Sequence, residues 1–140
     1  MFTVGYVSRF MEDPREDHWA AVKRLLRYVK GTVDQVIVFP KIGGGSELWL
    51  TVFSDADMAG DIDGWRSTSG VLVLLGSAPI SWLSLKQKVV ALSTCEAEYV
   101  AAATAACQAV WLRRLLGEMT GVEAHPPALC HRPREESGSS

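Results

Sequence analysis

Three strand-length apolar runs followed by one long helical run constrain the fold of this chain more than any other feature. The runs cover residues 47–55, 69–76 and 79–91, and turn-prone residues separate them. Short connections of this kind join neighbouring antiparallel strands, so the pattern predicts a three-stranded antiparallel sheet. The run at 69–76 is apolar on both faces and is therefore expected at the centre of that sheet.

A long helix is predicted over residues 94–117. Ser93 and Glu96 form the S-x-x-E pattern of a capping box, and Gly117 or Gly121 can end the helix. Residues three and four positions apart share one face, which consists of Glu98, Ala102, Ala105, Ala109, Leu112 and Leu116. Because alanine is small, this face is expected to lie close on the sheet, with Trp82 in the interface.

A second helix is predicted over residues 14–30, where Asp13 suits the N-cap and Pro14 the first helical position. Its expected buried stripe consists of Trp19, Val22, Leu26 and Val29. The opposite side carries four cations, which are Lys23, Arg24, Arg27 and Lys30. A short strand is predicted at 35–40, followed by a glycine-rich turn or linker at 41–46.

Composition excludes several classes of protein. The chain has 140 residues, 48% of them hydrophobic, which is typical of one globular domain or slightly more and not of a disordered chain. Its net charge of −2 provides no overall basic field for nucleic acid. No apolar run reaches the roughly 18 residues that span a bilayer, and the first residues lack a signal-peptide pattern. We therefore expect an intracellular chain, in cytoplasm or nucleus, with no membrane partner and with three reduced cysteines.

An acidic segment, SDADMAGDIDG at residues 54–64, is the first candidate for chemistry. Asp55 ends a predicted strand, and three further carboxylates follow it, which are Asp57, Asp61 and Asp63. Carboxylates this close repel one another, so a cation or a basic partner is one interpretation and a solvated acidic turn is the other. A calcium loop of the EF-hand type is excluded, because Ala59 and Arg66 occupy positions that need oxygen ligands.

Glu98 is the second candidate, because it lies on the apolar face of the long helix. An ionised glutamate there is costly unless it is paired or binds a metal, and by the pattern alone a structural or edge-exposed role is favoured. A strand ending in Asp, two more antiparallel strands and a helix with an inward Glu is the arrangement used in RNase H. In that arrangement carboxylates hold two Mg²⁺ ions roughly 4 Å apart.

The chain resembles the RNase H region of copia-type retrotransposon polyproteins. The motifs that carry the resemblance are SDAD-x-AGD, RSTSG, ISW, KQ, ALST, EAEY and WLRRLL. The upstream VSRFMEDPREDHWAAVKRLLRYVKGT resembles the segment that joins reverse transcriptase to RNase H in the same polyproteins. Together these stretches cover residues 4–118 in the order of the family, and Met58 stands where the family usually has Trp.

The resemblance implies an α/β, partial RNase H-like fold. It consists of a three-stranded antiparallel sheet with one long packed helix, preceded by a linker helix and a short strand. Three regions follow from it: a reverse transcriptase/RNase H connecting segment at 1–45, a truncated RNase H-like domain at 46–128, and a divergent tail at 129–140 that we expect to be disordered.

The resemblance also implies a site and a reaction. Asp55 and Glu98 would be catalytic residues and ligands of Mg²⁺ or Mn²⁺, and the substrate would be an RNA–DNA hybrid whose RNA strand is cleaved. The four cations of the helix at 14–30, Lys23, Arg24, Arg27 and Lys30, either bind nucleic-acid phosphates or form a solvated helix face.

One departure from the family affects the expected activity. After the long helix the family continues with a strand that ends in a third catalytic Asp, whereas this chain has ALCHRPREESGSS, with His131 at that position. The later acidic residue of the family is also absent. The expected activity is therefore impaired. The alternatives are a catalytically inactive remnant that binds nucleic acid or an unknown protein partner, and a chain with no selected function.

Overall fold

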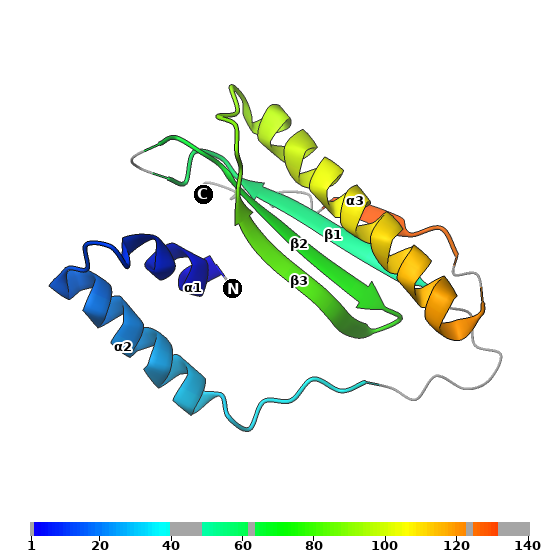
Figure 1. Cartoon of the computed structure of the whole chain (residues 1–140), viewed down its shortest axis with the longest axis horizontal. Coiled ribbons are helices and arrows are strands. Elements are labelled where there is room, and N and C mark those ends of the chain that lie inside the picture. The colour runs from blue at the N-terminus through cyan, green and yellow to red at the C-terminus, as the bar shows by residue number, and fades with distance from the viewer. Residues whose placement is uncertain (1, 40–48, 62–63, 123–124, 132–140) are drawn as a thin grey trace, which may run out of the picture.

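The structure is a computed structural model that describes residues 2–39, 49–61, 64–122 and 125–131, without the side chains of Phe2 and His131. It contains four helical segments and four strands among these residues (Figure 1). In chain order they are α1 (Phe2–Val7), the 3₁₀ helix η1 (Ser8–Phe10), α2 (Glu16–Gly31), β1 (Leu50–Asp57), β2 (Thr68–Leu75), β3 (Ala78–Lys86), α3 (Thr94–Thr120) and β4 (Ala128–His131).

The strands form one sheet in the order β3-β2-β1-β4. The first three are antiparallel neighbours, as the turn signals predict, with β2 in an interior position. β4 is parallel to β1, from the pair Thr51 and Ala128 to the pair Ser54 and His131. A parallel neighbour requires a crossover connection, and α3 provides it by running along β1 (Figure 1). The α/β class and the partial RNase H-like fold are confirmed, but the sheet has four strands and not three.

Alternation along β1 and β2 builds the core between sheet and helix. Leu50 and Val52 of β1 and Val71 and Val73 of β2 are buried on the face that α3 covers. They pack against three residues of α3, which are Ala105, Ala109 and Leu112. A second cluster lies nearer the start of α3 and consists of Ala56, Ala91, Ala97 and Ala101. The small side chains let the helix backbone approach the sheet closely.

The ends of α3 follow the sequence signals. The Glu96 backbone N–H donates to Ser93 Oγ at 3.1 Å, so the predicted N-cap is present. Glu96 Oε2 accepts from Leu92 N at 2.7 Å and not from Ser93 N, so the reciprocal half of the predicted capping box is displaced by one residue. Gly121, with φ of 68°, adopts the left-handed conformation that ends the helix.

The phase of the helix face and the position of Trp82 differ from the prediction. The centre of the first half of the buried face of α3 is Ala97 and Ala101, so Glu98 and Ala102 lie at its margin and are half-buried. Trp82 is 49% exposed, because it pairs with Leu72 on the opposite face of the sheet from α3. That opposite face is not covered by α3, which explains why a large apolar side chain remains accessible there.

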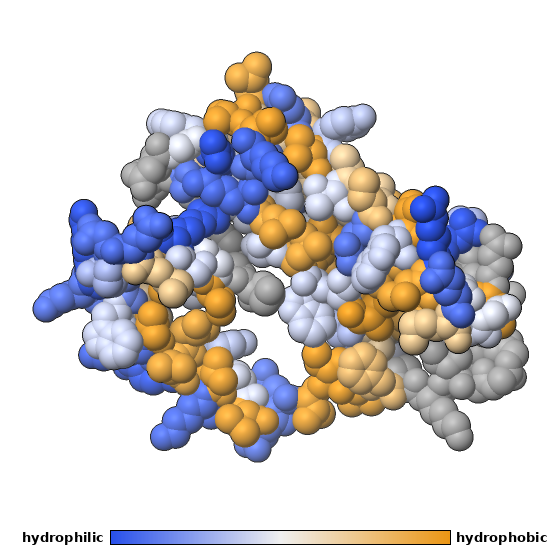
Figure 2. Space-filling model, viewed as in Figure 1, coloured by the Kyte–Doolittle hydropathy of each residue, from blue (hydrophilic) through white to orange (hydrophobic). Residues whose placement is uncertain are grey.

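The N-terminal helix is less buried than its pattern predicts. α2 has no fully buried residue, and most of the predicted stripe, including Trp19, Leu26 and Val29, is exposed. The helix packs on α1 through a neighbouring face, because Ala21 and Leu25 share a pocket with Val4. Figure 2 shows hydrophobic residues gathered over α2 and the segment that follows it.

Residues 35–39 do not form the predicted strand and have no regular structure. They continue from the end of α2 and run apart from the strands (Figure 1), so no sheet edge pairs with them, and a strand needs a partner to satisfy its backbone. The remainder of that prediction, Pro40, lies outside the described residues, as does the turn at 41–46. Residues 129–131 belong to β4, and residues 132–140 also lie outside the described part.

No helix within the described ranges has the length and apolar composition needed to cross a membrane.

Candidate functional site

Glu98 lies in a pocket beside the sheet. The pocket is formed by α3, β1 and β4, and its lining consists of Ser54, Thr94, Cys95, Glu98, Tyr99, Ala102 and Leu129. Glu98 is half-buried, and its Oε2 atom is shielded from solvent. Ser54 is only 2% exposed. The site therefore combines one carboxylate with hydroxyl groups on a partly apolar wall.

Asp55 faces away from this pocket. Along β1, Ser54 and Ala56 are buried on the side of α3, whereas Asp55 is exposed and pairs with Gly70. Because side chains alternate along a strand, the Asp55 carboxylate lies on the opposite face of the sheet. The structure thus brings Glu98 to the pocket but does not include Asp55 in its wall.

The donor set of the pocket can be compared with the needs of Mg²⁺ or Mn²⁺. The Glu98 carboxylate and the hydroxyls of Ser54 and Thr94 are oxygen donors, which hard cations prefer. Among the side chains that the structure describes, no group of three or more His, Cys, Asp and Glu residues can hold a metal ion. The described lining therefore supplies one carboxylate beside hydroxyl groups, which is not a ligand set for two ions.

Asp61 is the acidic residue of the 54–64 segment whose role the structure defines. Its carboxylate is almost fully buried and forms an ion pair with Lys86 at the end of β3. Arg9 of η1 approaches the other oxygen, with Nη1 to Oδ1 at 3.6 Å. A Cβ at Gly64 would come within 2.7 Å of Asp61 Oδ2, so only glycine fits there without a shift. For Asp61 the basic-partner interpretation is confirmed.

Asp57 is exposed, so it fits the solvated-turn interpretation, and Asp63 lies outside the described residues.

The Lys86 ammonium that hydrogen-bonds Asp61 lowers the pKa of that carboxyl below its ordinary value. Desolvation of the carboxyl opposes the effect, and the charge of Lys86, the Gly64 backbone and the charge of Arg9 add to it. A folded pKa below the unfolded value of about 3.9 means that the ion pair stabilises the fold above that pH. Its contribution is lost as the pH falls through the lower, folded pKa.

Comparing Asp61→Asn with the unmodified chain tests this dependence. We expect the variant to be less stable at neutral pH, and the difference between the two free energies of unfolding to shrink below about pH 4. Urea unfolding at a series of pH values measures it. The exposed Asp57→Asn is the matched control and should change stability little at any pH. A constant difference down to acidic pH would contradict the ion-pair role.

Gln87 joins the sheet to α3, a role that sequence reasoning missed. It is 5% exposed, and its Nε2 donates to Ser69 Oγ of β2 and to the Ala97 carbonyl of α3, both at 2.9 Å. Its backbone N donates to the Ser67 carbonyl at 2.8 Å. Both residues of the KQ motif are thus structural, because Gln87 joins the sheet to α3 and Lys86 pairs with Asp61. The available signal was an amide within the predicted strand run at 79–91.

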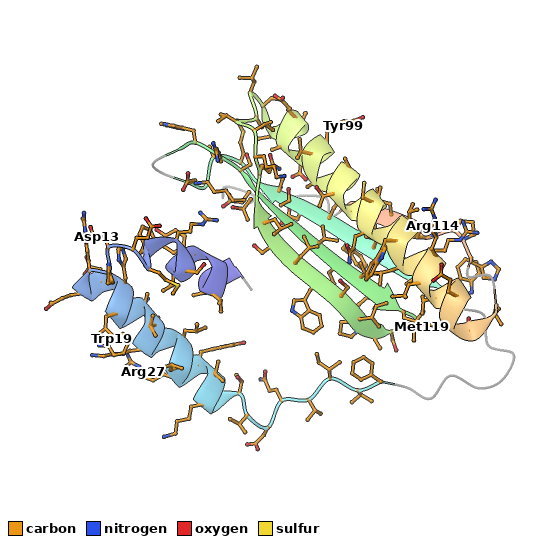
Figure 3. The ribbon with its side chains drawn as sticks, viewed as in Figure 1. Asp13, Trp19, Arg27, Tyr99, Arg114 and Met119 are labelled. Atoms are coloured by element: carbon orange, nitrogen blue, oxygen red, sulfur yellow. The ribbon has the colours of Figure 1, made fainter. Side chains whose placement is uncertain are left out.

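The four predicted nucleic-acid-binding cations, Lys23, Arg24, Arg27 and Lys30, are all exposed on α2 and do not line the Glu98 pocket. Lys23 Nζ lies 5.4 Å from the centre of the Trp19 ring. Figure 3 shows Trp19 and Arg27 extending from α2 on the side away from the strands. Trp19 and the four cations form an accessible basic and aromatic face on α2.

The three cysteines, Cys95, Cys107 and Cys130, are free thiols, as expected.

Comparison with known proteins identifies relatives by sequence alone, because no protein-family model and no solved structure matches the chain. The Retrovirus-related Pol polyprotein from transposon TNT 1-94 of Nicotiana tabacum is 49% identical over 116 residues, which are 83% of this chain and 8% of that protein. The Retrovirus-related Pol polyprotein from transposon RE2 of Arabidopsis thaliana is 44% identical over 128 residues, 91% of this chain and 9% of that protein.

A third relative is much shorter. Secreted RxLR effector protein 161 of Plasmopara viticola is 46% identical over 109 residues, which are 78% of this chain and 75% of the effector. The chain therefore spans less than a tenth of the two Pol polyproteins but most of the effector.

Proposed function

The chain belongs to the copia-type retrotransposon Pol polyproteins, and from this premise we propose that it is the RNase H-like part of such a polyprotein with an impaired site. The intact activity would be metal-dependent cleavage of the RNA strand of an RNA–DNA hybrid. The segment before the sheet, with α2, would be the connection from the reverse transcriptase. In this chain the cleavage is weak or absent.

The pairing of β4 with β1 is the observation that supports this proposal best. α3, which carries Glu98, lies between β3 and β4 in the chain, and β4 then pairs with β1 in parallel. The last residue of β4 therefore lies next to Ser54, which lines the Glu98 pocket. In the family this is where a strand ends in the third carboxylate. Here the paired residue is His131, and Mg²⁺ prefers oxygen ligands to imidazole. The fold thus supports the strand assignment, while the residue removes a ligand.

The charges of the described residues also indicate that the site is impaired. When bound, two divalent ions would supply an activated water and stabilise the leaving oxygen of the phosphodiester. Asp55 and Glu98 would have to hold them with only two negative charges, and they lie on different faces of the sheet. Asp61 cannot contribute, because Lys86 and Arg9 already neutralise it. Glu98 alone can orient one cation beside the hydroxyl of Ser54.

Cleavage of an end-labelled RNA–DNA hybrid with Mg²⁺ or Mn²⁺ tests the proposal. We expect the unmodified chain to cleave at or near background, because the third carboxylate is missing. His131→Asp restores that carboxylate and should increase metal-dependent cleavage. Glu98→Gln in the restored background should abolish the gain, because Glu98 lines the pocket beside the end of β4.

Two outcomes would contradict the proposal. Robust cleavage by the unmodified chain, lost in Asp55→Asn and in Glu98→Gln, would show that two carboxylates suffice. No gain in His131→Asp, with the fold preserved by circular dichroism, would show that β4 does not supply the missing ligand.

A second function, binding of nucleic acid or protein without catalysis, is favoured by the exposed face of α2, where Trp19 lies beside Lys23. The effector of Plasmopara viticola, matched over 75% of its length, is an example of a similar segment in a short protein. Salt-dependent binding to a hybrid that is unaffected by removing Mg²⁺, with no cleavage in His131→Asp, would favour this function over the first.

A further inference from the structure

The connection between β1 and β2 presents a tryptophan to solvent in an unusual conformation. Trp65 is 70% exposed and has φ of 53°, in the left-handed region that bulky residues rarely occupy. The backbone N–H of Trp65 donates to the Asp61 carbonyl at 2.9 Å, which closes the turn. Neither packing nor turn geometry requires an indole at this position. A strained backbone of this kind is typical of functional positions.

The loop that carries Trp65 is held firmly at its base. Ser67 is fully buried, its Oγ accepts from Ala59 N at 3.2 Å, and its carbonyl accepts from Gln87 N at 2.8 Å. The ion pair between Asp61 and Lys86 fastens the middle of the loop to the end of β3. The backbone that carries Trp65 is therefore held in place, which lowers the entropy cost of binding through this loop.

Two exposed cations accompany the indole. Arg66 follows Trp65 in the sequence and precedes Ser67, and Lys88 follows Gln87. Because the Gln87 backbone N–H donates to the Ser67 carbonyl, Arg66 and Lys88 lie at the same end of the β2–β3 ladder. Neither forms an ion pair with a described residue. Asp61 is already paired with Arg9 and Lys86, while Arg66 and Lys88 remain exposed cations at this end of the ladder.

We propose that Trp65, Arg66 and Lys88 form a binding site for single-stranded nucleic acid. The exposed indole would stack on an unpaired base, and the two cations would contact the flanking phosphates. A duplex hides its base faces, so an unpaired strand fits a projecting indole better than a hybrid does. An acidic peptide would satisfy the cations but would not use the flat face of the ring. This site is separate from Glu98 and does not depend on hybrid cleavage.

The test is fluorescence anisotropy of a labelled single strand of about 12 nucleotides, with the matching RNA–DNA hybrid as a second probe. Trp65→Gly removes the indole and suits the left-handed φ, so the fold is expected to persist. We expect affinity for the single strand to fall about tenfold. Arg66→Ala should make the dependence of log affinity on log salt concentration shallower by about 0.7. Trp65→Phe keeps a stacking ring and should retain most of the affinity.

Trp111→Ala is the matched control, because Trp111 is an exposed tryptophan on α3. Its single-strand affinity should equal that of the unmodified chain. The proposal is overturned if Trp65→Gly binds normally, if Trp111→Ala loses as much affinity, or if Trp65→Phe binds no better than Trp65→Gly. Preference for the hybrid over the single strand, or Trp65-dependent binding of a polyglutamate peptide in place of the single strand, would also overturn it. All readouts measure binding, so they remain informative whether or not the chain cleaves a hybrid.

Discussion

Replacing Leu50 with alanine is expected to lower the free energy of unfolding by about 2–5 kcal/mol. Leu50 is completely buried at the start of β1 and belongs to the core cluster with Val52, Val73 and Leu112. Truncation removes buried methyl groups and leaves a cavity that strands on one side and α3 on the other can fill only in part. Because small domains have total stabilities of about 5–15 kcal/mol, this variant would be close to unfolding.

Urea unfolding followed by circular dichroism measures the effect, with the free energy extrapolated to water. Leu85→Ala is the matched control, since Leu85 is also a strand leucine but is 53% exposed on β3. Its expected cost is about 0.5 kcal/mol. Equal losses in the two variants would show that the core does not lie between β1 and α3.

Local signals in the sequence account for most of the sheet and the long helix. The three apolar runs with turns between them specify the antiparallel strands, because short connections leave few other pairings. Ser93 and Glu96 mark the start of α3, since their side chains satisfy backbone groups within the same turn. The buried positions Ala105 and Ala109 follow from helical spacing alone.

Elements whose existence depends on distant partners could not be predicted. The four residues of β4 have little periodicity, and they form a strand because the free edge of β1 is available to them. Residues 35–39 are more apolar and have no such edge. Trp82 illustrates the same limit, because its hydrophobicity does not indicate which of the two sheet faces a helix will cover.

The candidate site was predictable only in part, for a similar reason. Glu98 was identified by its place on the helix, and it does line a pocket. Asp55 was preferred in the sequence because it ends a predicted strand, and nothing there indicated that Asp61 would be the buried, ion-paired carboxylate. What separates them is the partner, and Lys86 belongs to a strand that the sequence does not connect to Asp61. Strand alternation, which turns Asp55 away from α3, depends on which face is buried.

Replacing Gln87 with leucine is expected to lower the free energy of unfolding by about 2–4 kcal/mol. The change keeps the approximate volume but removes both side-chain hydrogen bonds, to Ser69 Oγ and to the Ala97 carbonyl. Each bond contributes about 0.5–1.5 kcal/mol, and a buried hydroxyl left without its donor costs about 1–3 kcal/mol. The Ser69 hydroxyl, at 2% exposure, cannot turn to water instead.

Gln108→Leu is the matched control, because Gln108 of α3 is half-buried and its Nε2 makes one longer bond, 3.3 Å, to Ser81 Oγ. It should cost less than about 1.5 kcal/mol. Combining Gln87→Leu with Ser69→Ala removes donor and acceptor together, so no hydroxyl is left unpaired. The double variant should therefore be more stable than the sum of the single losses implies, by about 0.5–3 kcal/mol. Strict additivity would show that Gln87 acts by filling space and not by bonding β2 to α3.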